Sequence, residues 1–249
     1  MRYFIELSYQ GTNYCGWQNQ PNATSVQSVI ENALSVLLRE KTEVVGAGRT
    51  DAGVHASYYV AHFDCQNKID CEKLVYRLNG FLPHDIAIKK IIEVKPDAHA
   101  RFDATYRTYH YQISQVKNPF VREFAFYYHF PLDVGKMNEA AALLFNYSDF
   151  TSFSKLHTDA KTNICKIYEA LWSKQNDLFI FNIKADRFLR NMVRAIVGTL
   201  MDVGMNKISI EDFKQIIENK NRCDAGISVP AKGLFLVDIG YQNQLRITN

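Results

Sequence analysis

The stretch EVVGAGRTDAGVHASYYVAHF, residues 43–63, contains three glycines and joins two short apolar segments through a connection that carries two of them. Residues 43–47 and 58–63 are rich in valine and aromatic side chains, which favours β-strands. In the connection, Gly48 and Gly53 allow the backbone to turn sharply and allow a partner to approach closely. We therefore expect two neighbouring strands with a glycine-rich loop between them.

The elements on either side of this strand pair complete a recognisable order. Residues 3–9 alternate as a strand does, and residues 25–38 carry apolar side chains at helical spacing, with Thr24 expected as the N-cap. Residues 71–78 are predicted to form a second helix and residues 86–94 a closing strand. The first half of the chain thus has the order β-α-β-β-α-β.

The second half repeats this order with one helix added. Strands are expected at residues 106–114, 167–173, 178–183 and 233–239, and helices at 136–145, 188–201 and 210–217. Residues 174–177, Lys-Gln-Asn-Asp, are typical of a hairpin turn. The resulting order, β-α-β-β-α-α-β, is that of a split βαβ unit with an extra helix.

Two such halves in tandem predict an α+β protein. We expect RRM-like or ferredoxin-like halves whose antiparallel sheets are joined side by side, with helices on one face and a cleft between the halves. The expected domains are residues 1–104, which carry the glycine-rich loop, and residues 105–249. This layout hosts many functions, so the chemistry must be inferred from individual residues.

Composition narrows the class of protein. The chain has 249 residues, of which 47% are hydrophobic and 22% charged, as in a globular protein with a sizeable core. Neither a secretory signal nor an apolar run long enough for a membrane helix is expected. The five cysteines are scattered without a C-x-x-C pair, which indicates a cytoplasmic protein without a disulfide framework or zinc site. A net charge of +3 is too small to identify an anionic partner.

The glycine-rich loop does not fit the familiar nucleotide-binding patterns. A phosphate-binding P-loop needs a lysine and a hydroxyl residue after its last glycine, and this loop has neither. Gly46, Gly48 and Gly53 are spaced G-x-G-x-x-x-x-G, whereas a dinucleotide fingerprint is G-x-G-x-x-G.

Two other kinds of site are also disfavoured. A second Asp-Ala-Gly at residues 224–226 resembles half of an aspartic-protease dyad, but neither copy has the hydroxyl residue that follows the aspartate in such proteases. The acidic and histidine residues show no metal-ligand spacing. We expect His55, His62 and His110 to make ordinary hydrogen bonds.

Asp51 is the first residue that could carry chemistry. It lies two positions after Arg49, so in an extended segment both side chains point the same way. A guanidinium beside a carboxylate keeps the carboxylate ionised and fixes its orientation, as a nucleophile requires. A structural ion pair that closes a tight turn explains the same residues equally well.

Three arginines precede or lie in the helix expected at residues 188–201. Arg187, Arg190 and Arg194 are spaced i, i+3 and i+7, which places them on one helical face. Apolar neighbours surround Arg194, so its charge needs an anionic partner, for which Asp51 or a phosphate is a candidate. A basic stripe on a surface helix is the alternative.

The strand expected at residues 106–114 carries aromatic side chains on both faces. Arg107, Tyr109 and Tyr111 share one side and offer two flat rings and a cation. Single-stranded RNA recognition uses such groups to stack unpaired bases. Packing within the sheet explains strand tyrosines as well, and Tyr109 is compatible with either role.

The segment GAGRTDAGVHA, residues 46–56, strongly resembles the signature of the tRNA pseudouridine synthase A family. Similar blocks follow in the family's order over nearly the whole chain. They are GWQNQ and SVQSVIENAL within 16–34, LPHDI at 82–86, ARFDATYRTYHY at 100–111, DFTSF at 149–153, FLRNMVRAIVG at 188–198 and PAKGLFL at 230–236.

This resemblance implies isomerisation of uridine to pseudouridine at positions 38, 39 and 40 of the anticodon arm of tRNA. By motif match, Asp51 is the nucleophile, Tyr109 binds the target uridine, and Arg49 and Arg194 support the aspartate or contact phosphate. The family's fold is a pair of α+β domains with a basic cleft, and it acts as a homodimer without metal or organic cofactor. Further phosphate contacts are expected at Arg101, Arg107, Lys155, Lys161 and Arg187.

The sequence departs from the family pattern at several residues, and it is compatible with two other functions. Gln10, Tyr58-Tyr59 and Val229 differ from the residues that the family usually shows, and Tyr58-Tyr59 lie close enough to the signature to affect which tRNA positions are chosen. A non-catalytic RNA-binding protein with two RRM-like halves is one rival, although the RNP1 pattern is absent. A glycoside hydrolase is the other, and it would need a second acidic residue.

Overall fold

The computed structural model describes residues 1–155 and 162–242, which form two compact units. Of the described residues, unit 1 comprises 1–105 and 236–242, and unit 2 comprises 106–155 and 162–235. The chain leaves unit 1 near the start of β5 (Ala104–Ser114) and returns to it within β9 (Leu234–Tyr241). The final strand, which follows unit 2 in sequence, therefore contributes most of its residues to unit 1.

Unit 1 contains a mostly antiparallel sheet with the strand order β4-β1-β3-β9, and β2 pairs with β3. Its other strands are β1 (Arg2–Tyr9), β2 (Val44–Gly46), β3 (His55–Asp64) and β4 (Ile86–Val94). β1 lies antiparallel to both β3 and β4, with Arg2 opposite Asp64 and Tyr9 opposite Ala56. This register places the glycine-rich loop and the chain after Tyr9 at the same end of β3.

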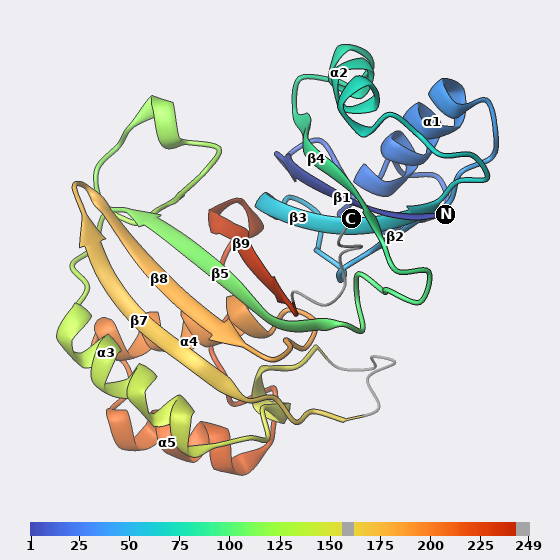
Figure 1. Cartoon of the computed structure of the whole chain (residues 1–249). Helices are drawn as coiled ribbons and strands as arrows, with labels where there is room; N and C mark the ends of the chain where they lie inside the picture. Colours follow the sequence, from blue (N-terminus) through green and yellow to red (C-terminus); the bar gives the residue numbers. More distant parts are fainter. Residues whose placement is uncertain (156–161, 243–249) are drawn as a thin grey trace. The chain divides into compact units, whose positions relative to one another are not determined.

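Two helices, α1 (Val26–Leu38) and α2 (Cys71–Phe81), pack on the sheet of unit 1 (Figure 1). The N-cap of α1 is Ser25 and not Thr24, because the Ser25 hydroxyl accepts the Ser28 N–H at 3.0 Å. The Ser28 hydroxyl pairs in turn with the Ser25 main chain and completes a capping box. The predicted helix is correct, and the cap lies one residue later.

Unit 2 contains an antiparallel sheet of β5, β8 and β7, in that order, with β6 parallel to β5. These strands are β6 (Phe126–Tyr127), β7 (Ile167–Gln175) and β8 (Leu178–Ala185). The predicted turn between β7 and β8 is present, with Asn176 in the left-handed conformation at φ 52°. Asparagine tolerates this conformation better than most residues do.

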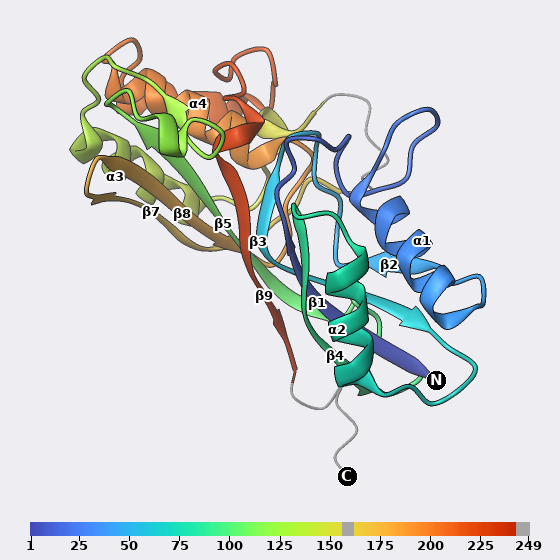
Figure 2. The same cartoon turned by 90° about the horizontal axis from the view of Figure 1, so that it is seen from above.

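The α-helices of unit 2 lie on one side of this sheet, as Figure 1 and Figure 2 show. They are α3 (Val134–Leu143), α4 (Met192–Gly204) and α5 (Ile210–Asn219). Unit 2 also contains the short 3-10 helices η1 (Pro119–Val121), η2 (Leu144–Asn146), η3 (Thr151–Phe153) and η4 (Ala231–Gly233). Helix α4 is buried along nearly its whole length. The α+β class with antiparallel sheets, predicted from sequence, is confirmed. In the two described ranges, no helix has the length and apolarity that a membrane crossing requires.

The start of α4 corrects one prediction about the arginines. The helix begins at Met192, because Asn191 adopts a left-handed conformation at φ 66° and donates a side-chain hydrogen bond to Ser228. Arg187 and Arg190 therefore precede the helix and share no helical face with Arg194. The apolar residues before Asn191 continued the helical pattern in the sequence without continuing the helix.

Candidate active site

Asp51 lies in the loop between β2 and β3 of unit 1 and is half-buried. Its carbonyl accepts the Val54 N–H at 3.1 Å, which closes a four-residue turn. Gly53 within this turn has φ 77°, a conformation that favours glycine. The main chain of the turn thus fixes the backbone from which the Asp51 carboxylate extends.

Contacts with the end of β1 and with the segment that follows it hold the other side of the loop. The Thr50 carbonyl accepts the Trp17 N–H at 3.3 Å, and the Thr50 hydroxyl shares a 2.9 Å hydrogen bond with Tyr9. Gly16 lies so close that an added Cβ would be 2.2 Å from the Thr50 carbonyl oxygen. Gly11 packs in the same way, because its Cβ would be 2.0 Å from the Val54 carbonyl oxygen. Such close approach of two backbones requires glycine on one of them.

A buried cluster of aromatic rings packs against the loop and supports it. Trp17 and Tyr59 stack with their ring centroids 4.1 Å apart, and Tyr9 lies 5.7 Å from Tyr59. The Tyr59 hydroxyl donates to the Gly48 carbonyl, and Gly46 has no room for a Cβ beside the rings of Trp17 and Tyr59. All three rings are buried. Tyr59 therefore supports the loop and is not exposed to a substrate, whereas Tyr58 is half-buried with the Lys89 ammonium 5.9 Å from its ring centre.

Arg49 and the histidines have different positions around this loop. Arg49 is exposed and lies two residues before Asp51, within reach of it along the chain. His55 is buried, and its Nδ1 accepts the Gly11 N–H at 3.0 Å, so it joins the two backbone segments. His62 accepts the Ala100 N–H at 3.1 Å, and His110 pairs with Asn182. The predicted ordinary hydrogen bonds of these histidines are confirmed.

In unit 2, Tyr109 and Tyr111 have unequal environments although they share one side of β5. Tyr109 is half-buried, and its ring lies edge-on to Phe188 with centroids 5.1 Å apart. Tyr111 is fully buried, donates to the Pro230 carbonyl at 2.9 Å, and has its pKa raised by burial. The prediction of two stacking surfaces is therefore wrong for Tyr111, and Tyr109 is the remaining candidate.

Arg194 lies in the first turn of α4 and is half-buried. Its Nε donates to the Val229 carbonyl at 2.7 Å, and the Val229 N–H donates back to the Arg194 carbonyl at 3.2 Å. These two bonds tie the arginine to the segment that precedes the PAKGL block. Arg107 is held similarly, because it donates to the Asp186 carbonyl at 3.0 Å.

The other cations proposed to contact phosphate differ in exposure. Arg101 and Lys155 are exposed, and Arg187 is half-buried. Lys161 lies outside the described residues. Over residues 1–155 and 162–242, no cluster of histidine, cysteine, aspartate or glutamate has the arrangement to bind a metal ion.

Comparison with known proteins gives a consistent family assignment. The tRNA pseudouridine synthase family matches residues 7–103 and 140–242 of the chain. A tRNA pseudouridine synthase A of Bacteroides fragilis is 59% identical over 246 residues, which cover 98% of each chain.

The chain belongs to the tRNA pseudouridine synthase family. Similarity extends to more distant bacteria. A tRNA pseudouridine synthase A 1 of Protochlamydia amoebophila is 43% identical over 97% of both chains. A tRNA pseudouridine synthase A of Caldicellulosiruptor bescii is 41% identical over 95% of this chain and 98% of its own.

The residues that support the glycine-rich loop around Asp51 were not predicted from the sequence. Tyr9 contacts the loop from the end of β1, Gly16 and Trp17 contact it from the segment that follows, and Tyr59 contacts it from β3. Gly16 and Trp17 are part of the GWQNQ block, whose similarity to the family was visible in the sequence. Their contact with Thr50 was not visible, because more than thirty residues separate the two segments in the chain.

Proposed function

We propose that Asp51 is the nucleophile with which this chain isomerises uridine to pseudouridine at positions 38, 39 and 40 of the anticodon arm of tRNA. Family membership establishes the reaction, the conversion of uridine in tRNA to pseudouridine. The assignment of Asp51 rests mainly on its being the only acidic residue in GAGRTDAGVHA, the segment that resembles the family signature. Main-chain contacts hold this loop on both sides, which supports the assignment.

The reaction breaks the bond between N1 of uracil and C1′ of the ribose and forms a bond between C5 and C1′. The base must be detached, rotated and reattached within the site. A carboxylate can assist by adding to C6 of the base, by capturing C1′, or by abstracting a proton from the sugar. Each route requires an ionised carboxylate close to the nucleotide. The atoms of substrate and product are the same, so the reaction consumes no redox or group-transfer cofactor.

The supporting contacts around Asp51 suit this role. A nucleophile contributes most when its position is fixed before the substrate binds. The turn from Asp51 to Val54, the Thr50 hydrogen bonds and the close packing of Gly16 restrict the loop backbone. Arg49, two residues away, would orient the carboxylate, and Arg194 would contribute a second positive charge.

The target uridine must leave its stack before the carboxylate can reach it. Unstacking a nucleotide costs a few kcal/mol. An aromatic ring that stacks on the extruded base offsets about 1–3 kcal/mol of that cost. Tyr109, half-buried on β5 and braced edge-on by Phe188, is the ring that we assign to this role.

Cations outside the immediate site would bind the tRNA backbone. We assign this role to Arg101, Arg107, Lys155, Lys161 and Arg187. Each phosphate that a cation neutralises releases counterions, so the affinity for tRNA would fall steeply as salt concentration rises. We further propose a cytoplasmic homodimer, in which two copies with a charge of +3 each present their cations to one tRNA. In each copy, residues 1–104 would supply the nucleophile and residues 105–249 would supply Tyr109 and Arg194.

The position of the product tests this proposal. Purified protein would be incubated with unmodified tRNA, and pseudouridine would be mapped along the sequence. We expect product at positions 38, 39 and 40 without release of free uracil. Product confined to other positions would refute the substrate assignment. Free uracil would indicate a glycoside hydrolase, and binding without product would indicate a non-catalytic RNA-binding protein.

A further inference from the structure

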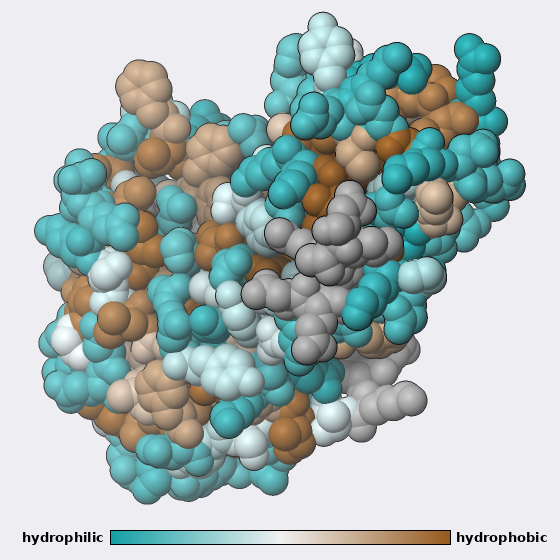
Figure 3. Space-filling view, viewed as in Figure 1, coloured by the Kyte–Doolittle hydropathy of each residue, from teal (hydrophilic) through white to brown (hydrophobic). Residues whose placement is uncertain are grey.

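The turn between β4 and β5 presents Phe102 to solvent, with 74% of the residue exposed. Phe102 follows Arg101, a proposed phosphate contact, but the pseudouridine synthase reaction assigns no role to its ring. Single exposed apolar residues are ordinary in soluble proteins, and Figure 3 shows others scattered over the visible face. Phe102 differs from the other exposed apolar residues because hydrogen bonds restrain the backbone of its turn.

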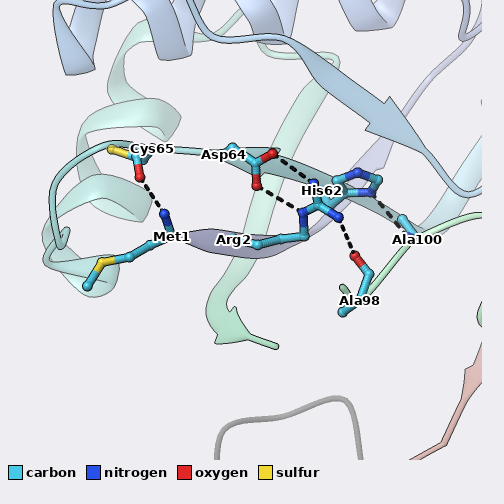
Figure 4. Close-up of polar contacts among 7 residues, drawn as sticks. All are labelled: Met1, Arg2, His62, Asp64, Cys65, Ala98 and Ala100. Atoms are coloured by element: carbon cyan, nitrogen blue, oxygen red, sulfur yellow. Dashed lines mark hydrogen bonds and ion pairs between the residues drawn. The ribbon is translucent and has the colours of Figure 1, made fainter. Parts of the chain in front are cut away.

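Side chains from two strands of unit 1 hold the turn (Figure 4). Arg2 of β1 donates to the Ala98 carbonyl at 3.1 Å, and His62 of β3 accepts the Ala100 N–H at 3.1 Å. Arg2 is itself fixed by two hydrogen bonds to Asp64, at 2.9 and 2.8 Å. The backbone before Phe102 is thus anchored at two points to the end of the sheet.

Hydrogen bonds within the turn fix the Phe102 backbone directly. His99 Nδ1 accepts both the Arg101 N–H at 3.1 Å and the Phe102 N–H at 3.3 Å. The His99 N–H donates to the Asp103 carboxylate at 2.7 Å, and the Asp103 N–H donates to the His99 carbonyl at 3.1 Å. A side chain on such a restrained backbone loses little conformational entropy when it binds a partner.

Three aromatic rings contact one another in a series that ends at Phe102, edge-on between His62 and His99 and tilted between His99 and Phe102. His62 and His99 lie 4.7 Å apart between centroids, and His99 and Phe102 lie 4.3 Å apart. Burial and the nearby Arg2 lower the pKa of His62 to about 4 and lower the pKa of His99 as well, which favours the neutral form of both rings. The Arg101 guanidinium lies 5.7 Å from the centre of the Phe102 ring. An exposed ring with a cation beside it is the arrangement that proteins use to stack nucleobases of single-stranded RNA.

We propose that Phe102 is a stacking platform for an unpaired base of the bound tRNA, with Arg101 beside it at a neighbouring phosphate. This contact rests on tRNA being the substrate, which the family establishes. It does not depend on which residue is the nucleophile.

The platform is remote from the target uridine. The Asp51 loop joins β3 at His55, whereas His62 anchors the Phe102 turn near the other end of the same strand. The seven residue-to-residue steps from His55 to His62 span about 23 Å of strand. The stacked base is therefore a different nucleotide from the one that reacts, and the contact contributes to affinity and not to the chemical step.

Replacement of the ring tests this separation of roles. In Phe102→Ala we expect the Kd for full-length unmodified tRNA to rise about 5- to 100-fold, the range that loss of one stacked base produces. The single-turnover rate at saturating enzyme and the modified positions should stay unchanged. Tyr76→Ala is the matched control, because Tyr76 is an 82% exposed aromatic residue on α2 of the same unit. Its Kd should stay within twofold of wild type.

Phe102→Trp gives a direct signal from the same position. The two native tryptophans, Trp17 and Trp172, are each only 3% exposed, so a tryptophan at 102 would dominate quenching by iodide. We expect bound tRNA to quench its emission and to protect it from iodide.

An unchanged Kd in Phe102→Ala, or a tryptophan at 102 that stays accessible in the tRNA complex, would overturn the proposal. A change in sedimentation with unchanged tRNA affinity would also overturn it and would assign the ring to a second copy of this chain. Failure of the nucleophile assignment would be distinct, because it would appear as activity in Asp51→Asn.

Discussion

The tripeptide Asp-Ala-Gly occurs twice in this chain, and its two copies have different structural roles. At Asp51 the turn is closed by the main chain, through the Val54 N–H and the left-handed Gly53. At Asp224 the carboxylate itself closes the loop after α5, because it accepts the side-chain amides of Asn219 and Asn221, each at 2.8 Å.

The glycines of the two copies differ as well. Gly226 packs on α4, where an added Cβ would lie 2.9 Å from the Thr199 nitrogen, and its N–H donates to the Thr199 hydroxyl at 2.9 Å. Gly53 is required for its backbone conformation. The comparison teaches that the same tripeptide can have different surroundings: in the first copy a left-handed Gly53 lies in a turn that the Val54 N–H closes, whereas in the second copy the Asp224 carboxylate accepts two side-chain amides.

The largest expected effect separates the two aspartates. Asp51→Asn removes the negative charge that the reaction requires, so we expect the single-turnover rate of pseudouridine formation to fall at least about a thousandfold. Asp224→Asn should change that rate less than twofold, because its carboxylate serves the loop after α5. Rates would be measured on the same unmodified tRNA. Equal losses in both variants would contradict the comparison.

Substitution of Gly53 should mainly affect kcat, whereas substitution of Gly226 should mainly affect the free energy of unfolding. Gly53→Ala places a side chain in the left-handed region at a cost of about 1–2 kcal/mol, and we expect the shifted loop to lower kcat about 10- to 100-fold. Gly226→Ala pushes against α4 and should lower the free energy of unfolding by about 1–3 kcal/mol with nearly normal kcat.

Denaturant unfolding and steady-state kinetics on both glycine variants would test this. Gly53→Asn is the control, since asparagine tolerates a positive φ better than alanine does. The expected separation fails if Gly226→Ala loses activity while Gly53→Ala keeps it.

Smaller effects are expected at the hydrogen bonds that support each copy. Tyr59→Phe removes the donor to the Gly48 carbonyl, and Thr199→Val removes the acceptor of the Gly226 N–H. Each should lower the free energy of unfolding by about 1 kcal/mol. Only Tyr59→Phe should also slow pseudouridine formation, by severalfold, because only it lies under the Asp51 loop. A larger kinetic defect in Thr199→Val would reverse the assignment.

Local periodicity was sufficient to predict most elements of the fold from the sequence. Residues 86–94 were predicted as a strand and match β4 at both ends. The helix predicted at residues 71–78 begins where α2 begins and ends shortly before α2 does, at Phe81. The start of α4 was wrong, because the contact between Asn191 and Ser228 that accompanies the left-handed turn joins distant parts of the chain. Apolar residues on either side of a turn give the same pattern as one continuous helix.

Those parts of the candidate site that leave a local pattern in the sequence were predictable. Glycines and a single carboxylate marked the Asp51 loop, and aromatic alternation marked β5. Tyr111 is buried with its hydroxyl bonded to the Pro230 carbonyl, and Tyr59, which supports the loop, packs against Trp17. Contacts between residues so far apart in the chain leave no local pattern, so packing could not be distinguished from substrate binding.

The most direct test of the Asp51 assignment is the tRNA affinity of Asp51→Asn, measured together with its product. If the carboxylate acts on the bound nucleotide, the variant should bind unmodified tRNA with a Kd within about threefold of wild type and form neither pseudouridine nor free uracil. Pseudouridine formation at a near-normal rate would contradict the assignment. A loss of affinity as large as the loss of activity would equally contradict it, since Asp51 would then serve binding and not chemistry.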